Sequence, residues 1–117
     1  MPHVILEYSD NLNTDPKNFV DLFKQLNAFL AEKLPADITA CKSRAVACQH
    51  FCIADGQDKD KVFIHVNIKI LSGRDEIHIK TVAQQVHKQL INYFANISSQ
   101  KIMISVEIST IPDNYVK

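Results

Sequence analysis

A pattern of hydrophobic spacing occurs twice in the same order along this chain, and it limits the folds that the chain can adopt. Each copy has a stretch of alternating apolar and polar residues, then apolar residues at helical spacing, then a second strand-like stretch. A polar turn over residues 54–61 separates the two copies. The pattern predicts six elements, in chain order strand 2–8, helix 16–33, strand 40–53, strand 62–70, helix 75–97 and strand 101–110.

The repeated order of strand, helix and strand defines the expected architecture. Two successive parallel strands need a crossover connection, which is right-handed in nearly all proteins. Two such β-α-β units give an α+β fold, a four-stranded sheet with two helices on one face. A length of 117 residues suits a single domain over residues 1–117, with the internal repeat units 1–55 and 56–117.

The sheet face that points away from the helices is predicted to be mixed in character. The alternation places polar side chains on that face, namely His65, Asn67, Lys69, Ser105 and Glu107. Phe63 and Met103 fall on the same face. Large apolar side chains on an open face favour burial against another chain, so the sequence predicts an oligomer.

Composition and charge argue against several functional classes. Thirteen basic and thirteen acidic side chains cancel, and the pI is near 6.9, whereas domains that bind nucleic acid or membrane surfaces usually carry a basic excess. No apolar run is long enough to cross a bilayer. The start of the chain lacks the charged and apolar regions of a signal peptide, so we expect a cytoplasmic protein.

The cysteines, histidines and glycines argue against metal and nucleotide chemistry. Cys41, Cys48 and Cys52 are odd in number and have no C-x-x-C spacing, which argues against a disulfide framework or a zinc site. The five histidines show neither H-x-x-x-H nor H-E-x-x-H spacing. The turn at residues 71–74 contains one glycine, unlike a phosphate-binding loop. The sequence therefore predicts chemistry without a metal or a cofactor.

The second residue is a candidate catalytic base. Initiator methionine is commonly removed before a residue as small as proline, and removal of Met1 would leave Pro2 with a free secondary amine. An α-amino group titrates near about 8, and nearby cations lower that value, which suits general-base chemistry at neutral pH. If Met1 is retained, the Pro2 nitrogen is a tertiary amide and accepts no proton. The alternative is that Pro2 is only a stiff residue at a strand edge.

Three cations are candidate partners of that amine. Lys42 and Arg44 lie in the predicted second strand, and Arg74 follows the third strand at a glycine turn. Such side chains would lower the pKa of the amine, bind an anionic substrate and stabilise an enolate as its charge develops. Arginine matches a carboxylate with two hydrogen bonds, which lysine cannot do. The alternative for each cation is an ordinary surface charge.

Short motifs along nearly the whole chain occur in the same order and at similar spacing in one known family. They are Met1-Pro2-His3, Glu7 with Ser9-Asp10-Asn11, Ser43-Arg44, Ala54-Asp55-Gly56-Gln57, Phe63-x-His65 and Gly73-Arg74. In these motifs the chain resembles 5-carboxymethyl-2-hydroxymuconate isomerase, a member of the tautomerase superfamily, whose fold is built from β-α-β units around an N-terminal proline.

The resemblance implies a homotrimeric isomerase that uses no cofactor. Members of this family interconvert a 2-hydroxymuconate dienol and its 2-oxo-hex-3-ene-dioate ketone in the bacterial breakdown of homoprotocatechuate. The resemblance implies that the nitrogen of Pro2 takes a proton from the 2-hydroxyl side and returns it to carbon 5. It also implies that Arg74 and Arg44 bind the substrate, together with Lys42, which stands where the family motif has an arginine.

The lysine at position 42 leaves two other interpretations open. Lys42 keeps the positive charge of the arginine but loses its planar fork. A second interpretation therefore keeps the proline base and changes the substrate to another 2-oxo or enol acid, as in a phenylpyruvate-type tautomerase or a hydratase of unsaturated acids. A third interpretation is a non-catalytic trimeric protein that keeps the fold without the activity.

Overall fold

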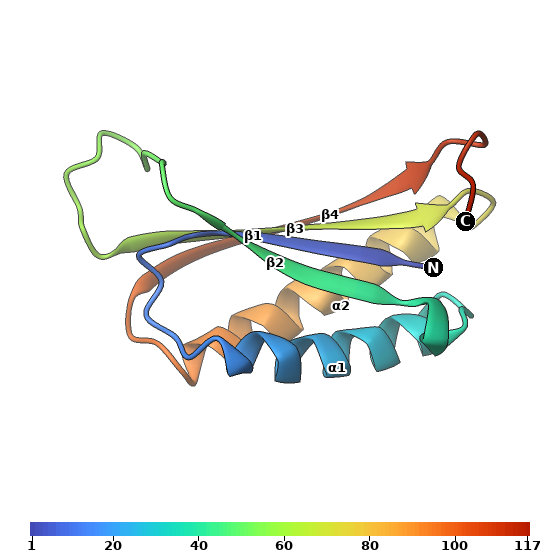
Figure 1. Ribbon diagram of the computed structural model, residues 1–117, viewed down its shortest axis with the longest axis horizontal. Coiled ribbons are helices and arrows are strands. Elements are labelled where there is room, and N and C mark those ends of the chain that lie inside the picture. The colour runs from blue at the N-terminus through green and yellow to red at the C-terminus, as the bar shows by residue number, and fades with distance from the viewer.

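A computed structural model describes all 117 residues of the chain, from Met1 to Lys117 (Figure 1). In chain order its elements are β1 (His3–Ser9), α1 (Lys17–Lys33), the 3-10 helix η1 (Ile38–Ala40), β2 (Lys42–Cys48), β3 (Lys61–Leu71), α2 (Glu76–Ala95) and β4 (Lys101–Ile111). The predicted order of strand, helix and strand in each half of the chain is confirmed.

The four strands form one sheet in the order β2-β1-β3-β4. β1 runs parallel to β2 and β3 runs parallel to β4, whereas the central pair of β1 and β3 is antiparallel. His3 pairs with Lys42 and Lys61 pairs with Lys101, so the sequence offset between parallel partners is the same to within one residue. Both crossover helices lie on one face of the sheet (Figure 1), as two copies of one β-α-β unit require.

β2 is shorter than the predicted strand 40–53. Its seven residues pair with the seven residues of β1, and the pairing ends where Cys48 meets Ser9. β2 is also an edge strand, so it has no second partner that could extend it. The chain therefore leaves the sheet after β2 as a loop, in which Ala54 and Gly56 adopt positive φ.

The hydrophobic core lies between the two helices and one face of the sheet. Alternate residues of β1 and β3 supply the sheet side, and those in the core are at most 1% exposed. The buried helix residues are Phe19, Leu22, Phe23, Leu26 and Leu30 of α1 and Val82, Val86, Leu90 and Phe94 of α2. This one-sided burial specifies the strand register, because a slip of one residue would turn the apolar set to solvent.

Carboxylate side chains mark where the helices begin. The carboxylate of Asp15 accepts a hydrogen bond from the N–H of Lys17 at 3.1 Å, and that of Asp75 accepts one from the N–H of His78 at 3.1 Å. Pro16 occupies the N-cap of α1 rather than the predicted first helical position. Neither helix is long and apolar enough to cross a membrane.

The opposite face of the sheet is open, and its side chains form rows because the register aligns one residue from each strand. From the N-terminal end of β1, the rows are Lys42-His3-Lys69-Ser109, then Arg44-Ile5-Asn67-Glu107, then Val46-Glu7-His65-Ser105. Phe63 and Met103 pair with each other beyond the third row. The predicted mixed character of this face is confirmed, and its cationic end lies beside Pro2.

Candidate functional site

Pro2 immediately precedes β1 and lies beside the start of β2. Its carbonyl oxygen accepts a hydrogen bond from the N–H of Lys42 at 3.1 Å. Met1 and Pro2 are both buried. With Met1 attached, the Pro2 nitrogen is an amide. Removal of Met1 would take away a buried side chain and free this nitrogen one residue from the cleft described next.

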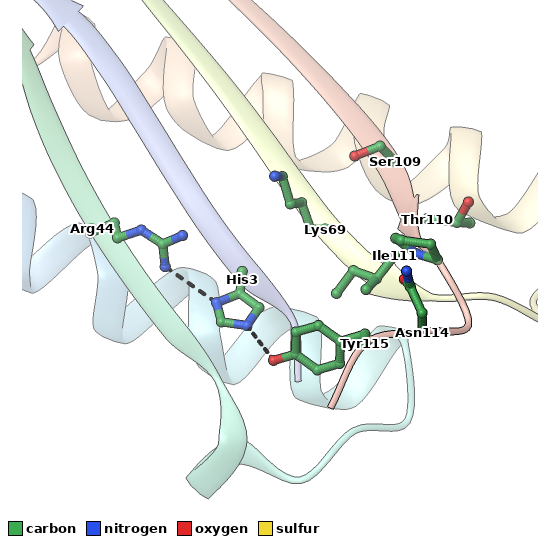
Figure 2. A pocket seen from close by; sticks show the side chains of 9 residues that line it. His3, Arg44, Lys69, Ser109, Thr110, Ile111, Asn114 and Tyr115 are labelled. Carbon is green, nitrogen blue, oxygen red and sulfur yellow. Dashed lines mark hydrogen bonds between the residues drawn. The ribbon is translucent and has the colours of Figure 1, made fainter. Parts of the chain in front are cut away.

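A cleft of about 450 Å³ opens on the sheet face away from the helices, where β1 begins and β4 ends (Figure 2). β1, β2 and β3 each contribute one basic residue to its lining, which are His3, Arg44 and Lys69. The end of β4 and the segment after it supply further lining residues, Ser109 and Tyr115 among them. No carboxylate lines the cleft, although acidic and basic residues balance in the chain as a whole. The cleft is therefore suited to an anionic ligand.

His3 is held between Arg44 and Tyr115 (Figure 2). Its Nδ1 lies 3.2 Å from a guanidinium nitrogen of Arg44, and its Nε2 lies 2.9 Å from the hydroxyl oxygen of Tyr115. A guanidinium can only donate, so Nδ1 of the neutral ring accepts and Nε2–H donates to the Tyr115 hydroxyl. These two contacts specify the tautomer of His3 and tie the C-terminal segment to β1.

The surroundings of His3 lower its pKa below the usual 6.5. Desolvation by burial is the largest cause, followed by the positive charges of Arg44, Lys42, the N-terminal amine and Lys69. The neutral ring, which accepts the Arg44 hydrogen bond, is therefore favoured near neutral pH.

The predicted cations differ in how they relate to the cleft. Arg44 lines it, whereas Lys42 lies beside it with an exposed side chain, and the Nζ of Lys42 donates to the carbonyl of Ala40 at 3.2 Å. In the single chain, the structure thus brings His3, Arg44 and Lys42 together next to Pro2.

Arg74 lies outside this cluster. Its Nε and Nη2 donate to the carbonyl of Leu34 at 3.2 and 2.9 Å, and its Nη1 donates to the carbonyl of Leu71 at 2.9 Å. It borders a second hollow, of about 730 Å³, which adjoins the cleft and shares Ser109 and Thr110 with it. A role for Arg74 in substrate binding stays a prediction.

Of the residues that line the cleft, only Arg44 belongs to the sequence-based site, and His3, Lys69 and Tyr115 are among those that sequence reasoning missed. The alternation of β3 does place Lys69 on the open face, but only the register with β1 shows that it lies beside His3. Tyr115 has no such signal, because its position depends on the path of the chain after β4.

Comparison with known proteins identifies the family. The family model for 5-carboxymethyl-2-hydroxymuconate isomerase matches residues 2–117. A solved structure of a 5-carboxymethyl-2-hydroxymuconate isomerase from Deinococcus radiodurans R1 is similar with a TM-score of 0.83 and 27% identity, over 99% of this chain and 88% of that chain. A search of curated proteins finds no match.

Two further solved structures share the fold. A 5-carboxymethyl-2-hydroxymuconate delta-isomerase has a TM-score of 0.76 and 20% identity, over 100% of this chain and 87% of that chain. A member of the cis-3-chloroacrylic acid dehalogenase family has a TM-score of 0.75 and 14% identity, over 98% and 79%. The family match over almost the entire sequence, together with this fold, shows that the chain belongs to the 5-carboxymethyl-2-hydroxymuconate isomerase family of the tautomerase superfamily and is an isomerase.

Proposed function

We propose that this protein is a tautomerase that moves a proton within a 2-hydroxymuconate-type dienol carboxylate, such as 5-carboxymethyl-2-hydroxymuconate, with the nitrogen of Pro2 as general base. The observation that carries the proposal is the position of Pro2 beside a cleft that is lined by cations and free of carboxylates. Membership of the isomerase family supports the substrate class. The proposed reaction needs no cofactor and belongs to the breakdown of homoprotocatechuate, within the degradation of 4-hydroxyphenylacetate.

The proposed mechanism begins with the removal of Met1, which leaves a basic secondary amine on Pro2. This amine takes the proton of the 2-hydroxyl group, and the electron pair of the O–H bond forms the carbonyl at carbon 2. The two double bonds of the dienol shift, so that one remains between carbons 3 and 4 and carbon 5 becomes nucleophilic. The protonated amine then delivers its proton to carbon 5 and is free again.

Cations supply the electrostatic part of the proposed mechanism. Arg44 uses one N–H on His3 and has further donors for a substrate carboxylate and for the oxygen that gains charge. Lys42 adds positive charge beside it. Arg74 borders the adjoining hollow, where it would meet a third carboxylate on a substrate that extends past the end of β4. It would have to exchange carbonyl hydrogen bonds for that contact.

The proposed assembly is a homotrimer. The open sheet face supports this proposal, because it carries Phe63 and Met103 on the side that no helix covers. A trimer formed through this face would also enclose the edge of the cleft, which lies on the same side of the sheet.

Two measurements test the proline base. The intact mass of protein from its native host should lack methionine. Pro2→Ala, also without Met1, should lower kcat on 2-hydroxymuconate by about 100-fold or more, because general-base catalysis contributes at least that much in typical enzymes. A form with one glycine inserted before Pro2 should be inactive as well, since it turns the nitrogen into an amide.

A matched control for these variants is Lys24→Gln, which changes an exposed residue of α1 and should leave kcat unaltered. A native mass that includes methionine, or nearly full turnover by the glycine-extended form, would contradict the proposed mechanism.

Lys42 favours a second candidate function, a tautomerase of another 2-oxo or enol acid. The Nζ of Lys42 donates a hydrogen bond to a backbone carbonyl. Unlike a guanidinium, it cannot bind a carboxylate with two parallel hydrogen bonds, so fewer carboxylate contacts are available on the β2 side of the cleft. A higher kcat/KM for the enol of phenylpyruvate than for 2-hydroxymuconate would support this candidate. No turnover of either compound by protein without Met1 would contradict both candidates.

A further inference from the structure

We propose that Lys69 is a second carboxylate anchor of the cleft, which acts with Arg44 to hold the two ends of a dicarboxylate across β1. No sequence motif marks Lys69 for this role. The inference rests on the proposed function, in which the substrate carries at least two carboxylates. It extends that function by naming the residue that selects a dicarboxylate over a monocarboxylate.

The first support is the arrangement of the two cations on either side of β1. Lys69 on β3 pairs directly with His3, whereas Arg44 comes from β2 on the other side and donates to His3 (Figure 2). Neighbouring strands lie about 4.8 Å apart, so the backbones of β2 and β3 are separated by about 10 Å. Arg44 reaches toward β1 from one side and Lys69 stands on the other, and both line the cleft. The space between the two charges suits a short unsaturated chain with a carboxylate at each end.

The second support is that the charge of Lys69 has no partner. Lys101 pairs with Asp58, and the carboxylate of Glu107 contacts His65, whereas Lys69 makes neither an ion pair nor a hydrogen bond. It nevertheless lines a cleft with Arg44, so two positive charges face the same empty space. Like charges held in this way repel, and a dianion between them would remove the repulsion.

The third support is the position of Lys69 within the sheet. Lysine often protects an edge strand from pairing with other chains, and this could explain Lys42 and Arg44 on the edge strand β2. It does not explain Lys69, because β3 is flanked by β1 and β4 and has no free edge. A ligand therefore accounts for Lys69 better than protection of the sheet.

Two probe ligands of equal chain length test this role directly. trans,trans-Muconate has a carboxylate at both ends of a six-carbon diene, and sorbate has the same diene with one carboxylate replaced by a methyl group. We expect calorimetric titration to show that Lys69→Gln weakens muconate binding by about tenfold or more, as expected for the loss of a charged hydrogen bond, and leaves sorbate binding within about twofold. Lys69→Arg should retain most of the muconate affinity.

The imidazole signals of His3 provide a second measurement. Lys69 is one of the cations that lower the pKa of His3, so bound muconate should raise this pKa in the wild-type protein. In Lys69→Gln, the rise on addition of muconate should be smaller. Lys24→Gln, on the exposed side of α1, is the matched control and should behave as the wild-type protein does.

Equal losses of muconate and sorbate affinity in Lys69→Gln would overturn the inference, because they would indicate a disturbed cleft rather than a lost carboxylate contact. Unchanged muconate affinity would overturn it as well. Neither measurement depends on turnover. The kcat of the Pro2 variants therefore tests the proline base, and ligand binding by the Lys69 variants tests the carboxylate anchor independently.

Discussion

At His3, one imidazole ring connects three parts of the chain that are distant in sequence. His3 is the first residue of β1 and directly follows the candidate base Pro2. Its ring accepts a hydrogen bond from Arg44 of β2 and donates one to Tyr115, which lies in the segment after β4. Protonation of the ring would remove the acceptor on Nδ1 and place a third positive charge between Arg44 and Lys69. The order of the cleft should therefore depend on the charge of this one residue.

The stability of the protein should fall on acidification, in part through His3. Its pKa in the folded state is below the 6.5 of the unfolded state, so the unfolded chain binds more protons between the two values and stability rises with pH there. The contribution is complete above about pH 6.5 and is lost as the pH falls through the folded value. We expect urea unfolding to show a smaller loss of stability from about pH 7.5 to about pH 5 in His3→Gln than in wild type.

A suitable comparison for this experiment is His50→Gln, which removes an exposed histidine of the loop after β2. If acidification lowers the free energy of unfolding equally in wild type, His3→Gln and His50→Gln, then His3 does not couple folding to pH.

The end of α1 is joined to the beginning of α2 by side-chain hydrogen bonds to backbone carbonyls. Arg74 donates twice to the carbonyl of Leu34, and Nε2 of His78 lies 2.7 Å from the carbonyl of Lys33. The last carbonyls of a helix have no partner within the helix, so these contacts satisfy groups that would otherwise be unpaired. Because η1 and β2 follow α1, this junction also helps to orient the strand that carries Arg44.

Arg74→Ala should destabilise the fold by about 2 kcal/mol, because it leaves carbonyls of the buried Leu34 and of Leu71 without their donors. Arg74→Lys should lose a large part of the same stability, since one ammonium cannot reproduce the three contacts. Urea unfolding followed by circular dichroism measures both, with the exposed Lys80→Ala of α2 as control. A fully stable Arg74→Ala that loses activity on tricarboxylates would instead indicate that Arg74 serves mainly in substrate binding.

Local patterns were sufficient to predict most elements, but less of the site. Alternation in β3 and helical spacing in α1 and α2 correspond to burial, so these elements were predicted with only small errors at their ends. The length of β2 depends on its partner β1, which no local pattern contains. The same limit applies to the cleft: Arg44 was predicted from its motif, whereas Lys69 depends on strand register and Tyr115 on the fold of the C-terminal segment.

The open sheet face changes character along its strands, from one end of the molecule to the other. The row beside Pro2 is cationic, and His65 contacts Glu107 near the middle, where Nε2 and Oε1 are 3.0 Å apart. At the far end, Phe63 pairs with Met103 and packs edge-on against Phe51 with ring centroids 6.2 Å apart. Association through this face would bury the apolar end while substrate enters at the cationic end.

Met103→Glu should therefore convert the proposed trimer into monomers. Met103 is 50% exposed in the single chain, and a carboxylate there would be buried without a partner when three copies associate. The desolvation of an unpaired charge opposes assembly, whereas the isolated chain keeps its core because Met103 lies outside it. Sedimentation velocity measures the change in mass, and circular dichroism verifies the fold.

Val20→Glu, at a site 55% exposed on α1, adds the same charge to the helix layer and should leave the trimer intact. If the trimer persists in Met103→Glu but dissociates in Val20→Glu, the interface lies on the helix layer instead of the open sheet face. The reason is that a carboxylate opposes assembly only where assembly buries it.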